Sequence, residues 1–159
     1  MIEVAVIGRR ARREEQVFVS GKIPMEYMYT AGAALDPFFK GLKDRGELYG
    51  TQCQSCGTRY FPPVHFCEIC FERIEKKVEV PGHGALASFT IAHHDHLGRP
   101  LEKPEIWGLI WLDGTDTPFI HRVIGDPMEI EIGAAVMATL KPKEKRAGAL
   151  DDIEGFEVI

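Results

Sequence analysis

Four closely spaced cysteines constrain this chain more than any other feature of its sequence. They are Cys53, Cys56, Cys67 and Cys70, which form the pattern C-x2-C-x10-C-x2-C within 18 residues. Two residues between paired cysteines let a tight turn direct both sulfurs at one point, and two such turns complete a tetrahedral shell of four thiolates. The pattern therefore predicts one structural zinc per chain, with no open coordination position for catalysis.

Three alternatives to zinc stay open at this point. Iron takes the same four ligands in rubredoxin, two disulfides could form, or a redox-active dithiol could lie beside two unrelated cysteines. The chain begins Met1-Ile2-Glu3 and becomes polar at Gly8, before an apolar run reaches the length of a signal peptide. We therefore expect a cytoplasmic protein with reduced cysteines, which disfavours the disulfides.

Charge and composition limit the partners that such a chain can bind. The 159 residues include 24 acidic and 19 basic side chains, which gives a formal net charge of −5. This charge disfavours nonspecific binding to nucleic acid or to an anionic membrane. Since 45% of the residues are hydrophobic and no stretch approaches the roughly 20 apolar residues of a membrane span, we expect one or two globular domains.

An arm and a helix are expected before the cysteines. Residues 1–34 contain two short alternating apolar runs and so resemble an extended arm, which packs either on its own domain or on a partner. Residues 35–46 are expected to form a helix, with Asp36 as its N-cap and Pro37 at the first helical position. Gly46 is a suitable C-terminal stop.

The cysteines and the second half of the chain predict two β-rich parts, a zinc ribbon over residues 47–73 and a barrel over residues 74–159. Residues 74–80 alternate between apolar and charged, and Gly82 and Gly84 follow, so one long bent strand is expected to continue to His93. Four further strand-like runs are separated by turn residues: 105–112, 119–124, 134–140 and 153–158. Five strands with a glycine-kinked first strand are typical of an OB-fold, so the predicted fold class is mainly β.

The order of these motifs resembles one known family, in which a rubredoxin-like zinc ribbon is fused to an OB-fold and is associated with acyl-CoA enzymes. After the helix, the motifs that carry the resemblance are Gly50 to Gly57, Phe61-Pro62-Pro63, Cys67 to Cys70, Gly84, Leu112-Asp113-Gly114 and His121-Arg122-Val123. The resemblance covers about residues 25–141 and includes Tyr29-Thr30-Ala31-Gly32, a segment of thiolase-associated members. The short segment from Ile124 to Ala134 departs from OB-folds that carry a helix before strand four.

The resemblance implies an accessory subunit. Members of this family partner a larger thiolase-like subunit in a hetero-oligomer, their OB-fold takes part in binding CoA thioesters or in bridging subunits, and some serve aromatic degradation. The residues agree, because the metal pattern uses all four cysteines and leaves none as a thiolase nucleophile. The alternative function is a nucleic-acid-binding protein with a zinc ribbon and an OB-fold, which the net charge disfavours.

Several barrel residues are candidates for contact with a CoA thioester. Arg99 and Arg122 could pair with its phosphates, and Trp111 shares a strand face with Trp107 that could meet the acyl group or a partner. The plainer alternatives are a surface salt bridge for the arginines and cover within the chain for the tryptophans. The run His93-His94-Asp95-His96 could supply a base or bind a metal, although three histidines at a strand end are more often a solvated loop.

Overall fold

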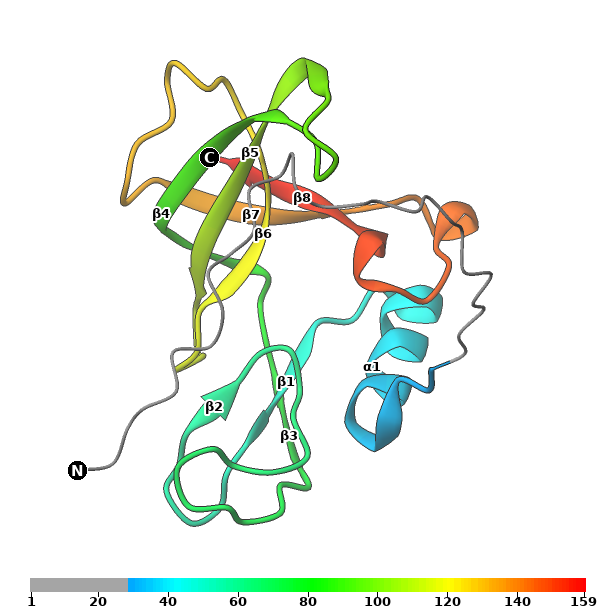
Figure 1. Cartoon of the computed structure of the whole chain (residues 1–159). Helices are drawn as coiled ribbons and strands as arrows, with labels where there is room; N and C mark the ends of the chain where they lie inside the picture. Colours follow the sequence, from blue (N-terminus) through cyan, green and yellow to red (C-terminus); the bar gives the residue numbers. More distant parts are fainter. Residues whose placement is uncertain (1–28) are drawn as a thin grey trace, which may run out of the picture.

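The β-strands divide between a small three-stranded sheet and a closed barrel, and a helix packs beside the small sheet (Figure 1). The computed structural model describes residues 29–159, so residues 1–28 of the expected arm lie outside the described part. In chain order the elements are α1 (Gly32–Arg45), β1 (Tyr49–Gln52), β2 (Arg59–Tyr60), β3 (Lys76–Glu79), β4 (His83–His94), β5 (Pro100–Leu112), β6 (Phe119–Ile124), β7 (Ala135–Leu140), η2 (Lys143–Lys145), η3 (Leu150–Asp152) and β8 (Ile153–Val158). The predicted mainly β fold is confirmed. Within residues 29–159, no helix has the length and apolar character needed to cross a bilayer.

Helix α1 begins earlier than the sequence predicts. It starts at Gly32 and contains Pro37, so Asp36 is not the N-cap; its carboxylate instead pairs with Lys40, one turn later, at 2.7 Å. The first three helical residues, expected to end the arm, are therefore part of α1. Two of them are alanines, strong helix formers that extend the helix back past the proline. The helix stops as predicted at Gly46, whose φ of 70° is left-handed.

The strand that leaves the ribbon joins a different sheet from the predicted one. The sequence predicts that residues 74–80 begin a long barrel strand, but β3 pairs antiparallel with β1, Gly50 opposite Val78, in the order β2-β1-β3. The predicted bend at Gly82 is thus a complete break between sheets, with a φ of 78° before β4 starts. A period-two pattern shows that a strand has one buried face but not which neighbour it pairs with.

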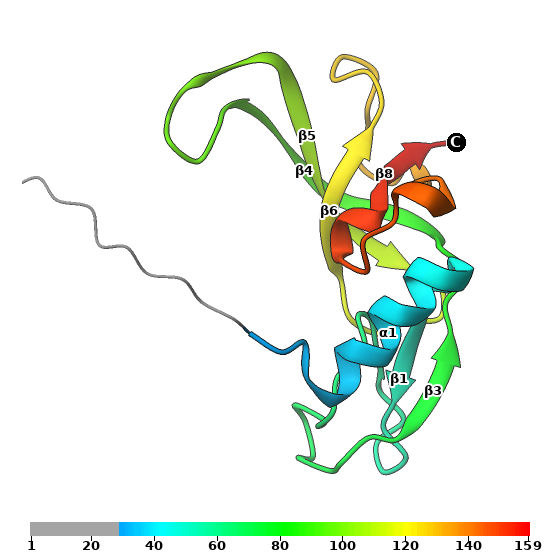
Figure 2. The same cartoon turned by 90° about the vertical axis from the view of Figure 1, so that its right-hand side faces the viewer.

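Five strands close the barrel in the order β4-β5-β6-β8-β7, with β7 paired back onto β4. Neighbouring strands are antiparallel except β6 and β8, which are parallel. Side chains alternate along each strand: on β6, Phe119, His121 and Val123 face the core, whereas Ile120 and Arg122 are exposed. The β4–β5 hairpin extends beyond the rest of the barrel (Figure 2).

The helix, the ribbon and the barrel share one hydrophobic core. A chain of aromatic rings runs through it, with centroid distances of 5.8 Å from Phe38 to Phe61, 5.0 Å from Phe61 to Phe119 and 6.0 Å from Phe119 to Phe156. The loop between β5 and β6 is also hydrogen-bonded to β2 through its backbone and a carboxylate. These contacts fix the ribbon relative to the barrel.

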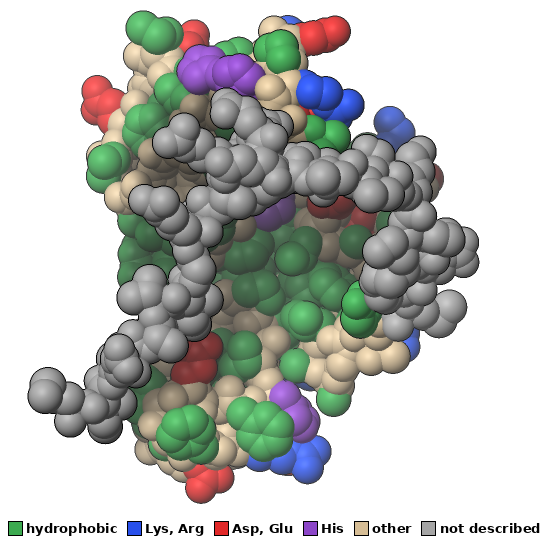
Figure 3. Space-filling view, in the orientation of Figure 1, with side chains coloured by type: hydrophobic (Ala, Val, Ile, Leu, Met, Phe, Trp, Pro, Cys, Tyr) green, Lys and Arg blue, Asp and Glu red, His purple; other side chains and the backbone are tan. Residues whose placement is uncertain are grey.

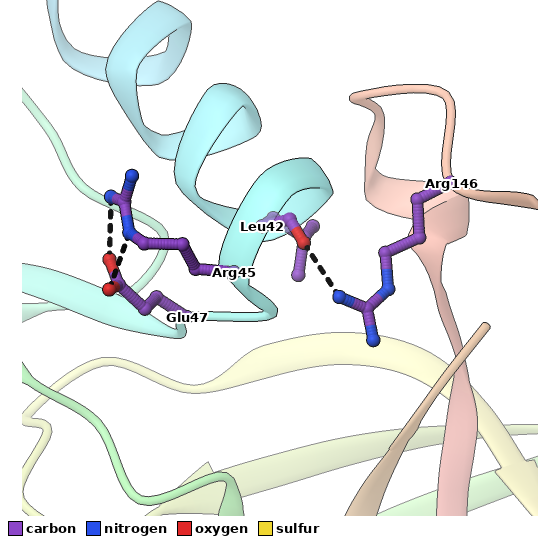
Figure 4. A network of polar contacts seen from close by, with 4 residues as sticks. All are labelled: Leu42, Arg45, Glu47 and Arg146. Atoms are coloured by element: carbon purple, nitrogen blue, oxygen red, sulfur yellow. Dashed lines mark hydrogen bonds and ion pairs between the residues drawn. The ribbon is translucent and has the colours of Figure 1, made fainter. Parts of the chain in front are cut away.

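The segment after β7 ties the end of α1 to the barrel. Arg146 donates through Nε to the Lys141 carbonyl at 2.7 Å and through Nη1 to the Leu42 carbonyl at 3.4 Å. Figure 4 shows this second contact together with the bidentate pair between Arg45 and Glu47. The Leu42 carbonyl lies in the last turn of the helix and already accepts a hydrogen bond from the Gly46 N–H at 3.0 Å, so the guanidinium adds a second, longer contact to this end.

Candidate functional site

Two turns of the same geometry carry the four cysteines. In the first, the Cys53 N–H donates to the Thr58 carbonyl at 2.9 Å, and the Gly57 N–H donates to the Cys53 carbonyl at 3.0 Å. The second turn, residues 67–72, repeats both hydrogen bonds at 2.9 and 3.0 Å. The repeated geometry directs two pairs of thiols at one another, as the C-x2-C spacing predicts.

The four cysteine sulfurs converge at one point. All lie within 4.8 Å of one another, with Cys53 and Cys70 at 3.4 Å and Cys56 and Cys67 at 3.5 Å. A tetrahedral ion with Zn–S bonds of about 2.3 Å requires sulfurs about 3.8 Å apart, whereas a disulfide brings them to about 2.05 Å. The arrangement supports a structural zinc, and iron in a rubredoxin-like shell has the same four ligands.

Two hydroxyl groups support the thiolates. Tyr60 is buried, and its hydroxyl lies 3.2 Å from the Cys67 sulfur while accepting a hydrogen bond from the Glu68 N–H at 3.1 Å. As a donor to the sulfur it lowers the pKa of Cys67 to about 6, and the same contact raises the pKa of Tyr60 to about 12. The Thr58 hydroxyl lies 3.2 Å from the Cys56 sulfur and lowers the pKa of that thiol. Sequence reasoning missed Tyr60, because only folding shows which aromatic residue faces a thiolate.

Strand β5 has two different faces, as its alternation predicts. Ile106, Ile110 and Leu112 are buried in the barrel core, whereas Trp107 and Trp111 are 39% and 43% exposed. The plainer interpretation required that the chain itself cover the tryptophan face. Within residues 29–159, no part of the chain does so. This face is open to a partner or a ligand.

The three candidate CoA residues lie on the β4–β5–β6 part of the barrel but not in one pocket. Arg122 points outward opposite Trp107, and Trp111 lies opposite Ala85, roughly 13 Å further along β5 at the usual rise per residue. Arg99 lies in the hairpin turn. Neither of the two cavities described for the molecule is lined by any of the three. Their contact with CoA stays a prediction.

The histidine run closes a turn. Asp95 accepts hydrogen bonds from the N–H groups of Leu97 and Arg99, both at 2.9 Å, and pairs with the Arg99 guanidinium at 2.6 Å. The neighbouring residues His93, His94 and His96 are exposed. Among residues 29–159, the four cysteines are the one group of three or more His, Cys, Asp or Glu side chains that could hold a metal ion. The geometry agrees with a solvated loop.

A groove of about 730 Å³ lies where the end of α1, β3 and β7 meet. Leu48, Val80 and Met137 supply apolar lining, and its charged groups are balanced, with Arg45 and Lys77 beside two glutamates. Sequence reasoning missed this groove because its walls come from three distant segments. No local motif marks it.

The cysteine cluster and the barrel together define a zinc-ribbon protein with an OB-fold. Residues 41–75 match the family described as ChsH2, rubredoxin-like zinc ribbon domain, and residues 77–141 match the ChsH2, C-terminal OB-fold domain. The chain belongs to this ChsH2 family of zinc-ribbon and OB-fold proteins. The predicted resemblance is thereby confirmed at the level of the family.

Similar proteins include one curated relative and two solved structures. The DUF35 domain-containing scaffold protein of Methanocaldococcus jannaschii is 25% identical over 104 residues, which are 65% of this chain and 74% of that protein. The crystal structure of a DUF35 family protein of unknown function from Sulfolobus solfataricus matches with a TM-score of 0.61 and 25% identity, over 80% of this chain and 87% of that one. The Ltp2-ChsH2(DUF35) aldolase matches with a TM-score of 0.56 and 26% identity, over 74% and 92%.

Proposed function

We propose that this chain is a noncatalytic, zinc-binding subunit of a thiolase-type acyl-CoA enzyme complex, in which it aids assembly and the binding of CoA thioesters. A larger thiolase-like subunit carries the reactive cysteine and forms or breaks a carbon–carbon bond of the thioester. Two names support a role in assembly, since one relative is called a scaffold protein and one similar structure is called the Ltp2-ChsH2 aldolase.

The observation that carries this proposal is an apolar strip on the outside of the barrel. This outer strip consists of Trp107, Leu109 and Trp111 on β5 and Ile120 on β6, which lies opposite Leu109 and is 66% exposed. Exposed tryptophans beside aliphatic side chains are typical of protein interfaces, where buried aromatic anchors contribute most of the binding free energy. The thiolase-like subunit would cover the outer strip.

The CoA thioester is proposed to lie at the edge of this interface. Arg122 is exposed, directly opposite Trp107, and forms no salt bridge within residues 29–159. A guanidinium placed in this way can pair with a CoA phosphate while Trp111 packs beside the acyl chain. Arg99 is a weaker candidate, because it would have to exchange its pairing with Asp95 for the phosphate.

The noncatalytic role follows from the cysteines. All four sulfurs lie in the one cluster, so none is free to act as a nucleophile. The expected result is no thioester turnover by the pure chain and full activity once the co-purifying subunit is added. Carbon–carbon cleavage by the pure chain would contradict the proposal, and cleavage by the complex without free CoA would assign the partner to aldolase rather than thiolase chemistry.

Interface and ligand contacts can be tested separately. The untagged chain should co-purify with a thiolase-like protein, and Trp107→Ser combined with Ile120→Ser should weaken the purified complex by at least about 10-fold. Met128→Ser is a matched control, because Met128 is 91% exposed and lies in the loop between β6 and β7, not on a strand of the outer strip. Arg122→Ala should raise the apparent Kd for CoA without dissociating the complex. Deleting residues 1–28 tests whether the expected arm adds to the interface.

A narrower form of this proposal follows from the resemblance of the sequence. It resembles the small subunit of benzoylsuccinyl-CoA thiolase from anaerobic toluene degradation, a cytoplasmic complex in this proposal. Turnover of benzoylsuccinyl-CoA by the reconstituted complex, set against other acyl-CoA thioesters, tests the substrate. Preference for an aliphatic thioester would exclude this narrower form and leave the accessory role intact.

A further inference from the structure

The two cysteine turns differ at one position that their shared geometry makes comparable. After the second cysteine of each pair, the first turn has Gly57 with a φ of 83°, and the second turn has Phe71 with a φ of 60°. Both residues donate the same hydrogen bond, at 3.0 Å, to the carbonyl of the first cysteine of the pair. Glycine adopts a left-handed backbone without steric cost, whereas a bulky residue there is strained.

Packing within the described chain does not compensate for this strain. The Phe71 side chain is 80% exposed, and two neighbouring apolar side chains, Ile69 and Phe66, are 66% and 58% exposed. These three residues form a surface that we call the ribbon tip. Figure 3 shows hydrophobic side chains at the lower end of the molecule, where Figure 1 places the ribbon. Strained residues retained at such a surface are typical of binding sites.

Two acidic residues are direct sequence neighbours of the ribbon tip. Glu68 directly precedes Ile69 and Glu72 directly follows Phe71, whereas Arg73 is bridged to Phe66 and pairs with Glu75 at 3.3 Å. Four thiolates around a divalent ion add further negative charge. The tip is therefore apolar, with a net negative charge beside it.

We propose that the ribbon tip is a second docking surface for the enzyme subunit, separate from the outer strip. It inserts Phe71, Ile69 and Phe66 into an apolar pocket bordered by lysine or arginine side chains. This inference rests on the proposed function, because that function supplies the partner. The net negative charge beside the tip favours a pocket with basic side chains over other occupants. An anionic membrane and the tip of a second copy would both repel that charge.

The test uses the strain itself. Phe71→Gly removes the side chain and relieves the backbone, so the variant should keep its zinc and its Tm, or raise the Tm. Its affinity for the purified thiolase-like subunit, measured by calorimetry with the full chain, should fall by about 10-fold or more. The affinity of Ile69→Ser should also fall, and Met128→Ser should bind like the wild type. Glu72→Gln should reduce the salt dependence of binding.

Each outcome of this experiment decides between the proposals. Wild-type affinity in both Phe71→Gly and Ile69→Ser would overturn the ribbon tip, while loss of binding by Trp107→Ser would still support the proposed function. A wild-type chain that does not bind the subunit would overturn both. Sedimentation of the chain alone as a dimer that Phe71→Gly disrupts, or flotation with vesicles of anionic phospholipid, would assign the tip to a second copy or to a membrane and so overturn the proposal.

Discussion

The ribbon and the barrel are stabilised by different means, although they share part of one core. The ribbon's own cluster of buried residues is small and contains two of the cysteines: Cys53, Tyr60, Cys67 and Ile74. The barrel buries a closed set of large apolar side chains, of which Leu86, Ile110, Val136 and Phe156 are fully buried. The ribbon therefore depends on a metal, whereas the barrel depends on apolar burial.

This difference follows from size. A segment of fewer than about 40 residues rarely buries enough apolar surface to be stable alone and usually requires metals, disulfides or a partner. The ribbon has this size, and in addition to the cysteine cluster it gains a contact with the barrel through Phe61 and Phe119 at 5.0 Å. Loss of the metal should therefore disorder the ribbon first and leave the barrel folded.

Replacing one ligand should have the largest effect. Cys67→Ser should reduce bound zinc far below one per chain, because apparent binding free energies of structural zinc are about 10–16 kcal/mol in zinc-finger peptides and contribute directly to folding. Metal analysis and amide NMR spectra would show an unfolded ribbon beside a folded barrel. Ser55→Ala, an exposed position in the first turn, is the control. Full zinc content in Cys67→Ser would contradict the ligand assignment.

A cavity in the barrel should destabilise the barrel and leave zinc binding by the ribbon unchanged. Phe156 is fully buried and packs edge-on against Phe119 and His121, so Phe156→Ala should lower the free energy of unfolding by about 3–5 kcal/mol. Zinc content should stay at one per chain while the barrel is folded. Urea unfolding with parallel metal analysis checks both, and the exposed neighbour Glu157→Gln is the control. Loss of zinc in native buffer would show that the two parts are not independent.

The features that could be predicted from the sequence are those set by local spacing. The C-x2-C pairs place two sulfurs on each of two turns, so the metal cluster follows from the pattern. Alternation along β5 and β6 likewise predicts that Trp107 and Trp111 share one face and that His121 and Arg122 lie on opposite faces, but it does not show that the tryptophan face is exposed. The five-stranded barrel follows from the number of alternating runs and the turns between them.

The features that were missed depend on contacts between distant segments. The pairing of β3 with β1 is not encoded in the alternation of β3 itself. The start of helix α1 before Pro37 is the exception, since its cause, two alanines that favour the helix, is local. The contact of Tyr60 with Cys67 and the groove beside α1 also arise only after folding. Side chains that support a metal site therefore require a structure.

Removing the Tyr60 hydroxyl should weaken zinc binding by the ribbon and make it more sensitive to pH. Tyr60→Phe should weaken zinc binding by about 10–100-fold, as is common for groups that orient metal ligands. Without this donor the lowered pKa of Cys67, about 6, returns toward its usual range, so zinc affinity should fall more steeply between pH 8 and pH 6. Competition with a chelator across this range measures it. Tyr49→Phe is the matched control, because the Tyr49 hydroxyl has no hydrogen-bond partner within residues 29–159. Equal affinities would contradict the role of Tyr60.

The smallest expected effect concerns acid stability outside the ribbon. Asp152 is buried and accepts hydrogen bonds from the Ala147 and Gly148 N–H groups, both at 2.7 Å. Burial raises the pKa of Asp152, but these backbone bonds, with one from Ala149, outweigh it and leave the pKa below its usual 3.8. Because a lowered pKa stabilises the fold only while the group is ionised, this contribution is complete above about pH 4 and is lost as the pH falls through the folded-state pKa.

Asp152→Asn should therefore lower the free energy of unfolding by about 1 kcal/mol at neutral pH, and the difference from the wild type should shrink below about pH 4. Urea unfolding followed by tryptophan fluorescence checks this, because both tryptophans lie on β5 of the barrel. Asp151→Asn, an exposed neighbour in the same short helix, should change little at any pH. Zinc content should be the same in both variants at neutral pH, since neither residue touches the ribbon cluster. A difference that persists unchanged at pH 3 would show that the charge of the Asp152 carboxylate does not contribute this stability.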